Sequence, residues 1–214
     1  MSGGYSIVVA GTVITASREN QYVSRQVTTR FATDAARISA IGTDAEEGMF
    51  SYNEDTDLYK SYGAAGWRQL PGQLIKRGNR ASSSSTTTTT EIGVLRVDDI
   101  PIMSGVVYLI STSPVYLLGN TNDTISLRAR VSTTGAAVTT DTQVGNALQL
   151  KTDSGQPPSS VFMAHYTAGT TGNLSVLVTV QRTSGSGNAQ TFDAFDLYIS
   201  AFALADPGDS GIDI

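Results

Sequence analysis

The sequence contains no cysteine and a single histidine. Without cysteine, neither a disulfide framework nor a thiolate-bound metal can hold the fold together. A single histidine also excludes a multi-histidine metal site within one chain. We therefore expect no metal and no cofactor, and a fold that is stabilised by side-chain packing.

Charge is also scarce, because Asp, Glu, Lys and Arg make up only 15% of the chain. The net charge of −5 is unevenly divided: residues 1–81 carry 9 basic and 8 acidic side chains, a net +1, and residues 82–214 carry 5 and 11, a net −6. A protein that wraps nucleic acid needs a basic face. This distribution therefore predicts no nucleic-acid partner.

Long apolar runs are missing as well. No run approaches the length of a membrane-spanning helix, and the N-terminus lacks the basic and apolar regions of a signal peptide. We therefore expect a soluble protein without membrane insertion. Apolar residues still make up 40% of the chain, which is enough for a packed core and argues against global disorder.

Aromatic residues concentrate in a stretch where they alternate with polar ones. Breaks rich in Asn, Asp and Gly divide this stretch into three runs, at 49–52, 58–62 and 67–70. Such runs predict a three-stranded meander, in which Leu58 and Tyr59 face opposite sides because strand side chains alternate. A meander of this size cannot bury a core alone, so it needs a neighbour in the same chain or in another copy.

The segment Asp34–Ile41 carries the local signals of a short helix. Thr33 occupies the N-cap position, Asp34 suits the positive end of the helix, and Gly42 can adopt the left-handed conformation that ends it. A helix this short is stable only when it is packed against something else. We expect it to pack on the meander.

Residues 82–90 read SSSSTTTTT and separate two parts of different composition. A run of hydroxyl side chains has too little apolar area to offset the entropy lost on ordering, so a linker is the default interpretation. O-glycosylation and extended pairing with a neighbouring chain are alternatives. The predicted organisation is an N-terminal helix-plus-meander module over 1–81, the linker, and a C-terminal domain over 91–214.

The C-terminal domain reads as a succession of strands separated by turns, which predicts an antiparallel β-sandwich or barrel, with a jelly-roll-like sandwich favoured by the number of strands. The predicted strands are Gly93–Val97, Val106–Ser111, Val115–Leu118, Ile125–Val131, Ala147–Lys151, Val161–Tyr166, Leu174–Gln181 and Phe192–Leu204.

The last of these strands is apolar on both sides. One side carries Phe195 and alternate apolar residues after it, and the other carries Tyr198 and Phe202. A strand of this kind lies either in the centre of a sandwich or against another subunit.

Candidate catalytic residues are few. Asp98 and Asp99 are adjacent, so on a regular strand they point to opposite faces and cannot act as a general acid and base pair. His165 lies in a predicted strand, where we expect a hydrogen-bonded structural role. We therefore expect no catalytic residues and no enzymatic activity, including glycoside hydrolysis, which needs two facing carboxylates.

One loop resembles a metal site more than the rest of the chain does. Asn120, Asn122 and Asp123 are similar to the start of a calcium loop, but no Gly and no terminal Glu follow at the required spacing. An ordinary turn stabilised by Asn and Asp side chains is the preferred interpretation.

The large aromatic and apolar side chains of the meander and of the last strand are the best candidates for contacts with other subunits or other proteins, because their burial stabilises an interface. A sugar-stacking platform made by Tyr59, Tyr62 and Trp67 is an alternative. The predicted oligomer or docking contacts are Met49, Phe50, Tyr52, Leu58, Tyr59, Tyr62, Trp67, Phe195, Tyr198 and Phe202.

An ordered set of motifs in the first third of the chain resembles a family. The set comprises the motifs at 11–17 (GTVITAS), 30–37 (RFATDAAR) and 47–52 (EGMFSY), together with Leu58-Tyr59 followed by Gly66-Trp67. It is similar to short virion proteins of tailed bacteriophages, of the minor tail, tail-fibre or head-fibre type. The C-terminal domain resembles the β-sandwich heads that follow such modules.

This resemblance implies a structural protein of the virion, assembled in the host cytoplasm. The N-terminal module would dock to other tail or capsid proteins, and the sandwich would be displayed, with three copies of the chain forming a homotrimer. A head fibre or decoration protein of the capsid is the related alternative. An alternative of a different functional class, independent of the resemblance, is that the sandwich binds a host-surface glycan, with Tyr116 or Tyr166 as contacts.

Overall fold

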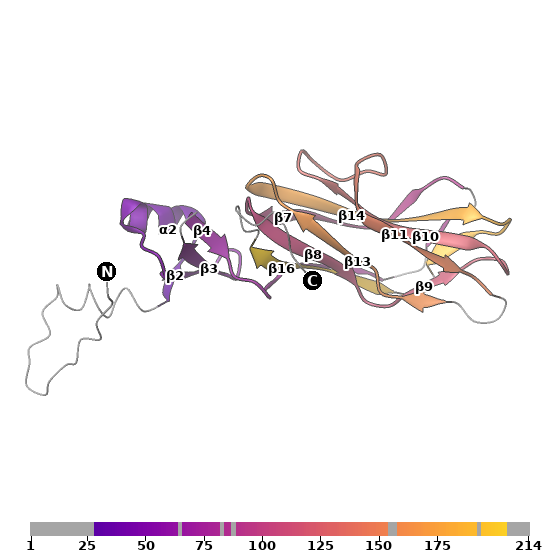
Figure 1. The fold of residues 1–214 in the computed structure, drawn as a ribbon, viewed down its shortest axis with the longest axis horizontal. Coiled ribbons are helices and arrows are strands. Elements are labelled where there is room, and N and C mark those ends of the chain that lie inside the picture. The colour runs from indigo at the N-terminus through magenta and orange to yellow at the C-terminus, as the bar shows by residue number, and fades with distance from the viewer. Residues whose placement is uncertain are drawn as a thin grey trace, which may run out of the picture. The chain divides into compact units, whose positions relative to one another are not determined.

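The computed structural model describes residues 28–63, 66–81, 84–86, 89–153, 158–191 and 194–204. Within these residues the protein is mainly β, with one short α-helix and several antiparallel sheets. The chain forms two compact units, Met1–Leu70 and Pro71–Ile214 (Figure 1). The motif at 11–17 lies outside the described residues.

Unit 1 contains a four-stranded sheet and a helix. Its strands follow the order β1-β2-β3-β4, with β1 parallel to β2 and the other pairs antiparallel. The predicted meander is confirmed as β2, β3 and β4, and β1 adds an edge strand. The elements are β1 (Thr29–Phe31), α2 (Asp34–Ile41), the 3-10 turn η2 (Gly42–Asp44), β2 (Phe50–Asn53), β3 (Leu58–Gly63) and β4 (Gly66–Gln69).

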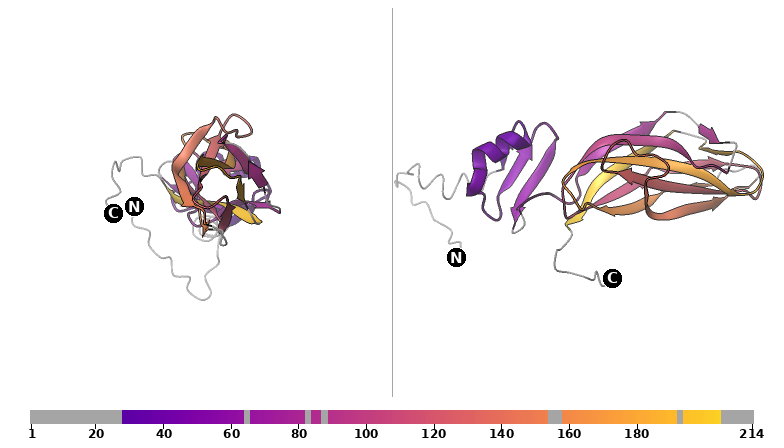
Figure 2. Two further views of the ribbon diagram at one scale, coloured as in Figure 1. Left: turned by 90° about the vertical axis from the view of Figure 1, so that its right-hand side faces the viewer. Right: turned by 90° about the horizontal axis from the view of Figure 1, so that it is seen from above.

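The helix has the predicted bounds and caps. Thr33 Oγ1 accepts a hydrogen bond of 3.1 Å from the backbone N–H of Ala36, which satisfies one of the donors left free at a helix N-terminus. Gly42 follows the last helical residue with φ of 51°, a conformation that glycine adopts readily. Helix α2 packs on one side of the meander, as the right-hand view of Figure 2 shows.

Unit 2 is a sandwich of antiparallel sheets. The two main sheets have the orders β11-β10-β14-β7 and β13-β8-β16-β5, and a smaller sheet has the order β12-β9-β15-β6. The strands are β5 (Leu74–Arg80), β6 (Ser84–Thr86), β7 (Ile92–Ile102), β8 (Val106–Thr112), β9 (Val115–Leu118), β10 (Thr124–Ser132), β11 (Thr142–Lys151), β12 (Ser159–Ser160), β13 (Met163–Thr167), β14 (Gly172–Ser184), β15 (Ala189–Thr191) and β16 (Phe195–Leu204).

The core of unit 2 lies between the two main sheets and is built from alternate residues of each strand. Each buried Val, Leu or Ile side chain contributes about 1.5–3 kcal/mol to folding. Tyr108 is the largest of these side chains, and its hydroxyl accepts a 2.8 Å hydrogen bond from the backbone N–H of Met103. Burial raises the pKa of Tyr108 to about 12, so this hydroxyl stays neutral.

The division between the units differs from the predicted one after residue 81. Strand β5 pairs with β16 in the sandwich, so residues from Pro71 onward belong to unit 2. Part of the predicted linker is also a strand, because β6 pairs with β15 of the same chain. Thr is favoured in extended strands. The composition of residues 82–90 does not reveal that a strand far along the sequence, β15, pairs with them.

Candidate interaction surfaces

The interior of unit 1, between helix and sheet, is held by a partly buried ionic cluster, in which Arg37 and Lys60 are buried and Asp34 is partly exposed. The Asp34 carboxylate accepts hydrogen bonds from Arg37 Nη2 at 2.7 Å, Lys60 Nζ at 2.7 Å and Asn53 Nδ2 at 2.8 Å. Partial burial raises the pKa of Asp34, but the bonds from Lys60, Arg37 and Asn53 outweigh this effect and lower the pKa to about 2. The Arg37 guanidinium also lies 4.4 Å from the ring centre of Trp67, a cation–π contact.

The opposite side of this sheet carries an aromatic face, which we define as Phe50, Tyr52 and Tyr59. Since Lys60 bonds to the helix, its neighbour Tyr59 points away from the helix. Tyr59 pairs with Tyr52 across the strands, and their ring centres are 4.9 Å apart. Phe50 and Tyr59 are 44% and 46% exposed, so this face offers apolar area to a partner.

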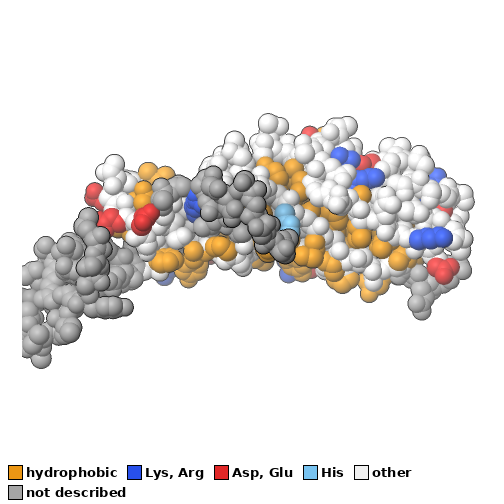
Figure 3. All heavy atoms as spheres, in the orientation of Figure 1, with side chains coloured by type: hydrophobic (Ala, Val, Ile, Leu, Met, Phe, Trp, Pro, Cys, Tyr) orange, Lys and Arg blue, Asp and Glu red, His pale blue; other side chains and the backbone are white. Residues whose placement is uncertain are grey.

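A second exposed apolar surface covers the outer side of the β13-β8-β16-β5 sheet. We define this sandwich face as Leu74, Leu109, Met163, His165, Tyr198 and Phe202. Met163, Phe202 and Leu74 are 59%, 53% and 52% exposed, and the His165 and Phe202 rings lie 5.0 Å apart. Figure 3 shows hydrophobic side chains gathered beside the chain's only histidine. His165 packs against the ring of Phe202. Its side chain makes no hydrogen bond with the described residues, so the predicted hydrogen-bonded role is wrong.

The polar edge of the sandwich face is fixed by one carboxylate. Asp196 accepts hydrogen bonds from Arg77 Nη2 at 2.7 Å, Asn79 Nδ2 at 2.9 Å and the Tyr198 hydroxyl at 3.0 Å. The bonds from Arg77 and Asn79 lower the pKa of Asp196. The positive charge of Arg77 and the negative charge of Asp196 therefore neutralise each other within one subunit. The sandwich face has no net charge at this edge.

The predicted contact residues fall into three groups. Leu58 and Phe195 are only 2% exposed, so they pack in the cores of their own units and offer no surface to a partner. The half-buried residues are Met49, Tyr52, Tyr62, Trp67 and Tyr198. Phe50, Tyr59 and Phe202 are exposed.

Sequence reasoning missed Leu74 and Met163, which dominate the sandwich face. Met163 alternates with Phe162 and Ala164, and only the pairing of β13 with β8 decides which of them faces outward. Of the two tyrosines suggested as glycan contacts, Tyr116 is exposed on β9, whereas Tyr166 is half-buried against the core.

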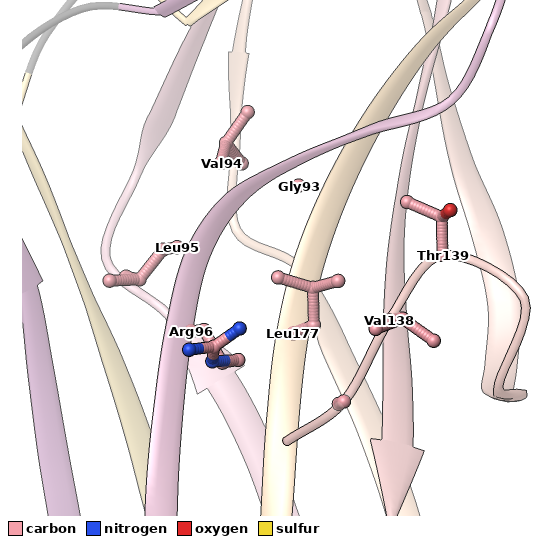
Figure 4. Close-up of a pocket in the computed structure, with 8 residues that line it drawn as sticks. Gly93, Val94, Leu95, Arg96, Val138, Thr139 and Leu177 are labelled. Atoms are coloured by element: carbon pink, nitrogen blue, oxygen red, sulfur yellow. The ribbon is translucent and has the colours of Figure 1, made fainter.

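The other main sheet carries two hollows beneath the loop that connects β10 to β11. The first has a volume of about 460 Å³. Figure 4 shows Leu177 of β14 between Arg96 of β7 and Val138 of the loop. The second has a volume of about 430 Å³. Its lining residues are Asp98, Asp99, Thr133, Thr134, Gly135, Ala136, Asn173 and Ser175.

The prediction that Asp98 and Asp99 point to opposite faces is wrong, because both line the second hollow. The register of β7 against β14 shifts here: Val97 pairs with Val176, and Ile100 pairs with Leu174. Two residues of β7 therefore oppose the single residue Ser175, which is a β-bulge, and Asp99 takes a φ of 54°. The bulge breaks the alternation on which the prediction rested.

The loop that resembles a calcium site is a structural turn. The Asp123 carboxylate is buried and accepts hydrogen bonds from the backbone N–H groups of Asn120 at 2.8 Å, Ser186 at 2.9 Å and Gly187 at 3.0 Å. These bonds join two turns of the sandwich. This arrangement agrees with the preferred interpretation of the loop as an ordinary turn, in which the Asp123 side chain makes the stabilising bonds.

Two further features concern metals and membranes. Among the described residues, no group of three or more acidic, cysteine or histidine side chains could hold a metal ion. In the same part of the chain, no helix has the length and hydrophobicity that crossing a membrane requires.

No family model matches the chain, and no curated protein sequence matches it. Among solved structures, Eiger TNF from S. frugiperda matches at 13% identity with a TM-score of 0.39, covering 65% of this chain and 100% of that chain. The CBM22-1 xylan-binding domain of Paenibacillus barcinonensis Xyn10C matches at 15% identity with a TM-score of 0.32, covering 62% and 90%. The infectious bursal disease virus Gx strain structure matches at 12% identity with a TM-score of 0.31, covering 67% and 42%. Likenesses this weak say nothing about function.

Proposed function

We propose that this chain is a structural protein of a tailed-bacteriophage virion, a minor tail or tail-fibre protein, and that three copies form a homotrimer. In this proposal unit 1 docks to the particle and the sandwich is displayed. The motif resemblance at 30–37, 47–52 and 58–67 supports the virion assignment. The exposed sandwich face is the observation that carries the homotrimer.

The sandwich face has the properties of a self-association surface. Three large apolar side chains, Met163, Phe202 and Leu74, are each more than half exposed, and contiguous apolar surface of this kind marks interaction sites. The two charged residues at its edge, Arg77 and Asp196, already form an ion pair, so the face has no free charge to attract a strongly charged partner. A second copy of the chain presents the same apolar face, which therefore suits self-association. Around a threefold axis, equivalent side chains of three copies can meet and exclude water.

The aromatic face of unit 1 is the proposed dock. Its partner is another virion protein, of the tail or, in the alternative of a head fibre or decoration protein, of the capsid. Aromatic side chains are the commonest anchors of protein interfaces, and Phe50 and Tyr59 are accessible. Three such faces on one trimer raise the avidity of a weak single contact.

An antibody against the sandwich tests the virion assignment. Purified particles of the phage that encodes the chain should be labelled at the tail if the protein belongs to the tail or its fibres, and over the head if it is a capsid fibre. Particles that contain none of the chain, by labelling and by mass spectrometry, would refute the assignment.

A further inference from the structure

The hollow at the β7 bulge has no role in the assembly described above. It lies on the outer side of the β11-β10-β14-β7 sheet, whereas the sandwich face belongs to the other main sheet. Its volume of about 430 Å³ falls in the range of small-molecule sites. We propose that this hollow, built around Asp98, Asp99 and Asn173, binds a neutral saccharide.

The floor of the hollow is organised before any ligand arrives. The buried Ser175 hydroxyl donates a 2.5 Å hydrogen bond to Asp98 Oδ1 and accepts one of 2.8 Å from the backbone N–H of Ala137. Arg96 Nε donates to Asp98 Oδ2 at 3.0 Å. These bonds fix the Asp98 carboxylate and pin the loop that forms the wall. A wall that is already ordered lowers the entropy cost of binding.

Other polar groups in the lining remain free. Within the described residues, the side chains of Asp99, Asn173 and Thr133 make no hydrogen bond to the protein. Together they offer a carboxylate that only accepts, an amide that both donates and accepts, and a hydroxyl that does either. Such a mixture matches the vicinal hydroxyl groups of a sugar, each of which donates and accepts.

The fixed charges around the hollow balance. Asp98 and Asp99 face the hollow, Arg96 is paired with Asp98, and Lys76 Nζ donates a 3.2 Å hydrogen bond to the backbone carbonyl of Asp99. Two positive and two negative groups leave no net charge to attract an anion or a cation, which favours a neutral ligand. Apolar contact for the C–H groups of a sugar ring comes from Ala136 in the wall and from Leu177 and Val138 in the adjoining hollow.

The arrangement favours binding over hydrolysis of the saccharide. The hydrogen bond from Ser175, aided by that from Arg96, lowers the pKa of Asp98 despite the opposing effect of its slight burial. The carboxylate therefore stays ionised and accepts hydrogen bonds. A general acid for glycosidic cleavage needs a carboxyl group whose pKa is raised.

A glycan array of neutral mono- and oligosaccharides, probed with the full chain, tests this inference, followed by calorimetry with the strongest hit. Asp99→Asn keeps a residue that tolerates positive φ and removes the charge, and Asn173→Ala removes the amide. Each change should weaken binding at least about tenfold, because a hydrogen bond to a charged or well-placed polar group is lost. Asp55→Asn, at an exposed turn of unit 1, is the matched control and should bind like the unchanged protein.

Two outcomes would overturn the saccharide site. One is the absence of saturable binding to any neutral saccharide on the array. The other is equal affinity in the unchanged protein and in both hollow variants. If Asp99→Asn fails to fold, Thr133→Ala and Asn173→Ala decide the question, because both side chains are exposed. Asn173→Ala should have the same mass in solution as the unchanged protein, because Asn173 lies outside the sandwich face. A failure to bind saccharide would therefore not count against the proposed trimer.

Discussion

Lys60 Nζ donates a 2.7 Å hydrogen bond to Asp34 Oδ1 and ties strand β3 to the first residue of helix α2. Lys60 is buried, and so is Arg37, which shares the same carboxylate. Removing the carboxylate leaves two buried positive charges without their partner, and such a loss is costly. We therefore expect the folding stability of unit 1 to depend strongly on Asp34.

We expect Asp34→Asn to destabilise unit 1 by about 2 kcal/mol, a value between those typical of buried and of exposed pairs because Asp34 is partly exposed. Trp67 is the only tryptophan of the chain and lies in unit 1, so its fluorescence during denaturant unfolding of the full chain reports this unit. Glu54→Gln, which removes the surface pair of Glu54 with Arg30, is the control and should change the midpoint little. Equal midpoints for the two variants would contradict the role of Asp34.

The same carboxylate predicts a pH dependence. The pKa of Asp34 is lowered from 3.8 to about 2 in the folded chain. The folded state therefore binds fewer protons than the unfolded state in this range. The stabilisation is complete above about pH 4 and is lost as the pH falls through about 2. Unfolding followed by Trp67 fluorescence should become easier on acidification, with a weaker dependence in Asp34→Asn. A midpoint for unit 1 that does not move on acidification would argue against the ionic cluster.

Gly78 tests the assignment of β5 to the sandwich. A Cβ at this position would lie 2.1 Å from Val97 Cγ2, so Gly78→Ala forces the Val97 side chain, or the strands β5 and β7 that pack there, to shift. Overpacking of this kind costs about 1–3 kcal/mol. Gly169→Ala, where a Cβ meets no atom within 4 Å, is the matched control. Thermal unfolding by circular dichroism should show a lower transition for Gly78→Ala only, and an unchanged transition would place residues 71–81 outside the sandwich.

The aromatic face should matter for the particle and not for the fold. We expect the double change Phe50→Ala and Tyr59→Ala to reduce incorporation into particles, because both side chains are exposed anchors whose loss removes contact area. Ile38→Ala, an exposed apolar residue of helix α2, should be incorporated normally. Quantitative immunoblotting of purified particles measures both. Equal incorporation of the two variants would exclude the aromatic face as the dock.

Local signals in the sequence predicted the local structure well. Thr33 and Gly42 set the ends of the helix by interactions within one turn, and the meander follows from alternating aromatic residues with turn residues between them. The β-sandwich was likewise visible in the alternation of its strands. Each of these features depends on residues that are near one another in the sequence.

The features that depend on distant pairing could not be predicted. The bulge that brings Asp98 and Asp99 to one hollow exists because β7 pairs with β14 in a shifted register. Strand β5 carries charged residues and a glycine, which weaken any strand signal, and it is held by β16. The outward position of Met163 follows from the pairing of β13 with β8. None of these pairings leaves a trace in a single sequence.

Light scattering, which measures the mass of the full chain in solution, shows whether the sandwich face holds three copies together. We predict three copies for the unchanged protein and a single copy for the double variant Phe202→Ser, Met163→Ser, because these changes remove the most exposed apolar area of the sandwich face. Val138→Ser, an exposed apolar residue over the other sheet, should remain trimeric. A single copy of the unchanged protein at every concentration would rule out the homotrimer, and a trimer that survives the double change would rule out the sandwich face as its contact.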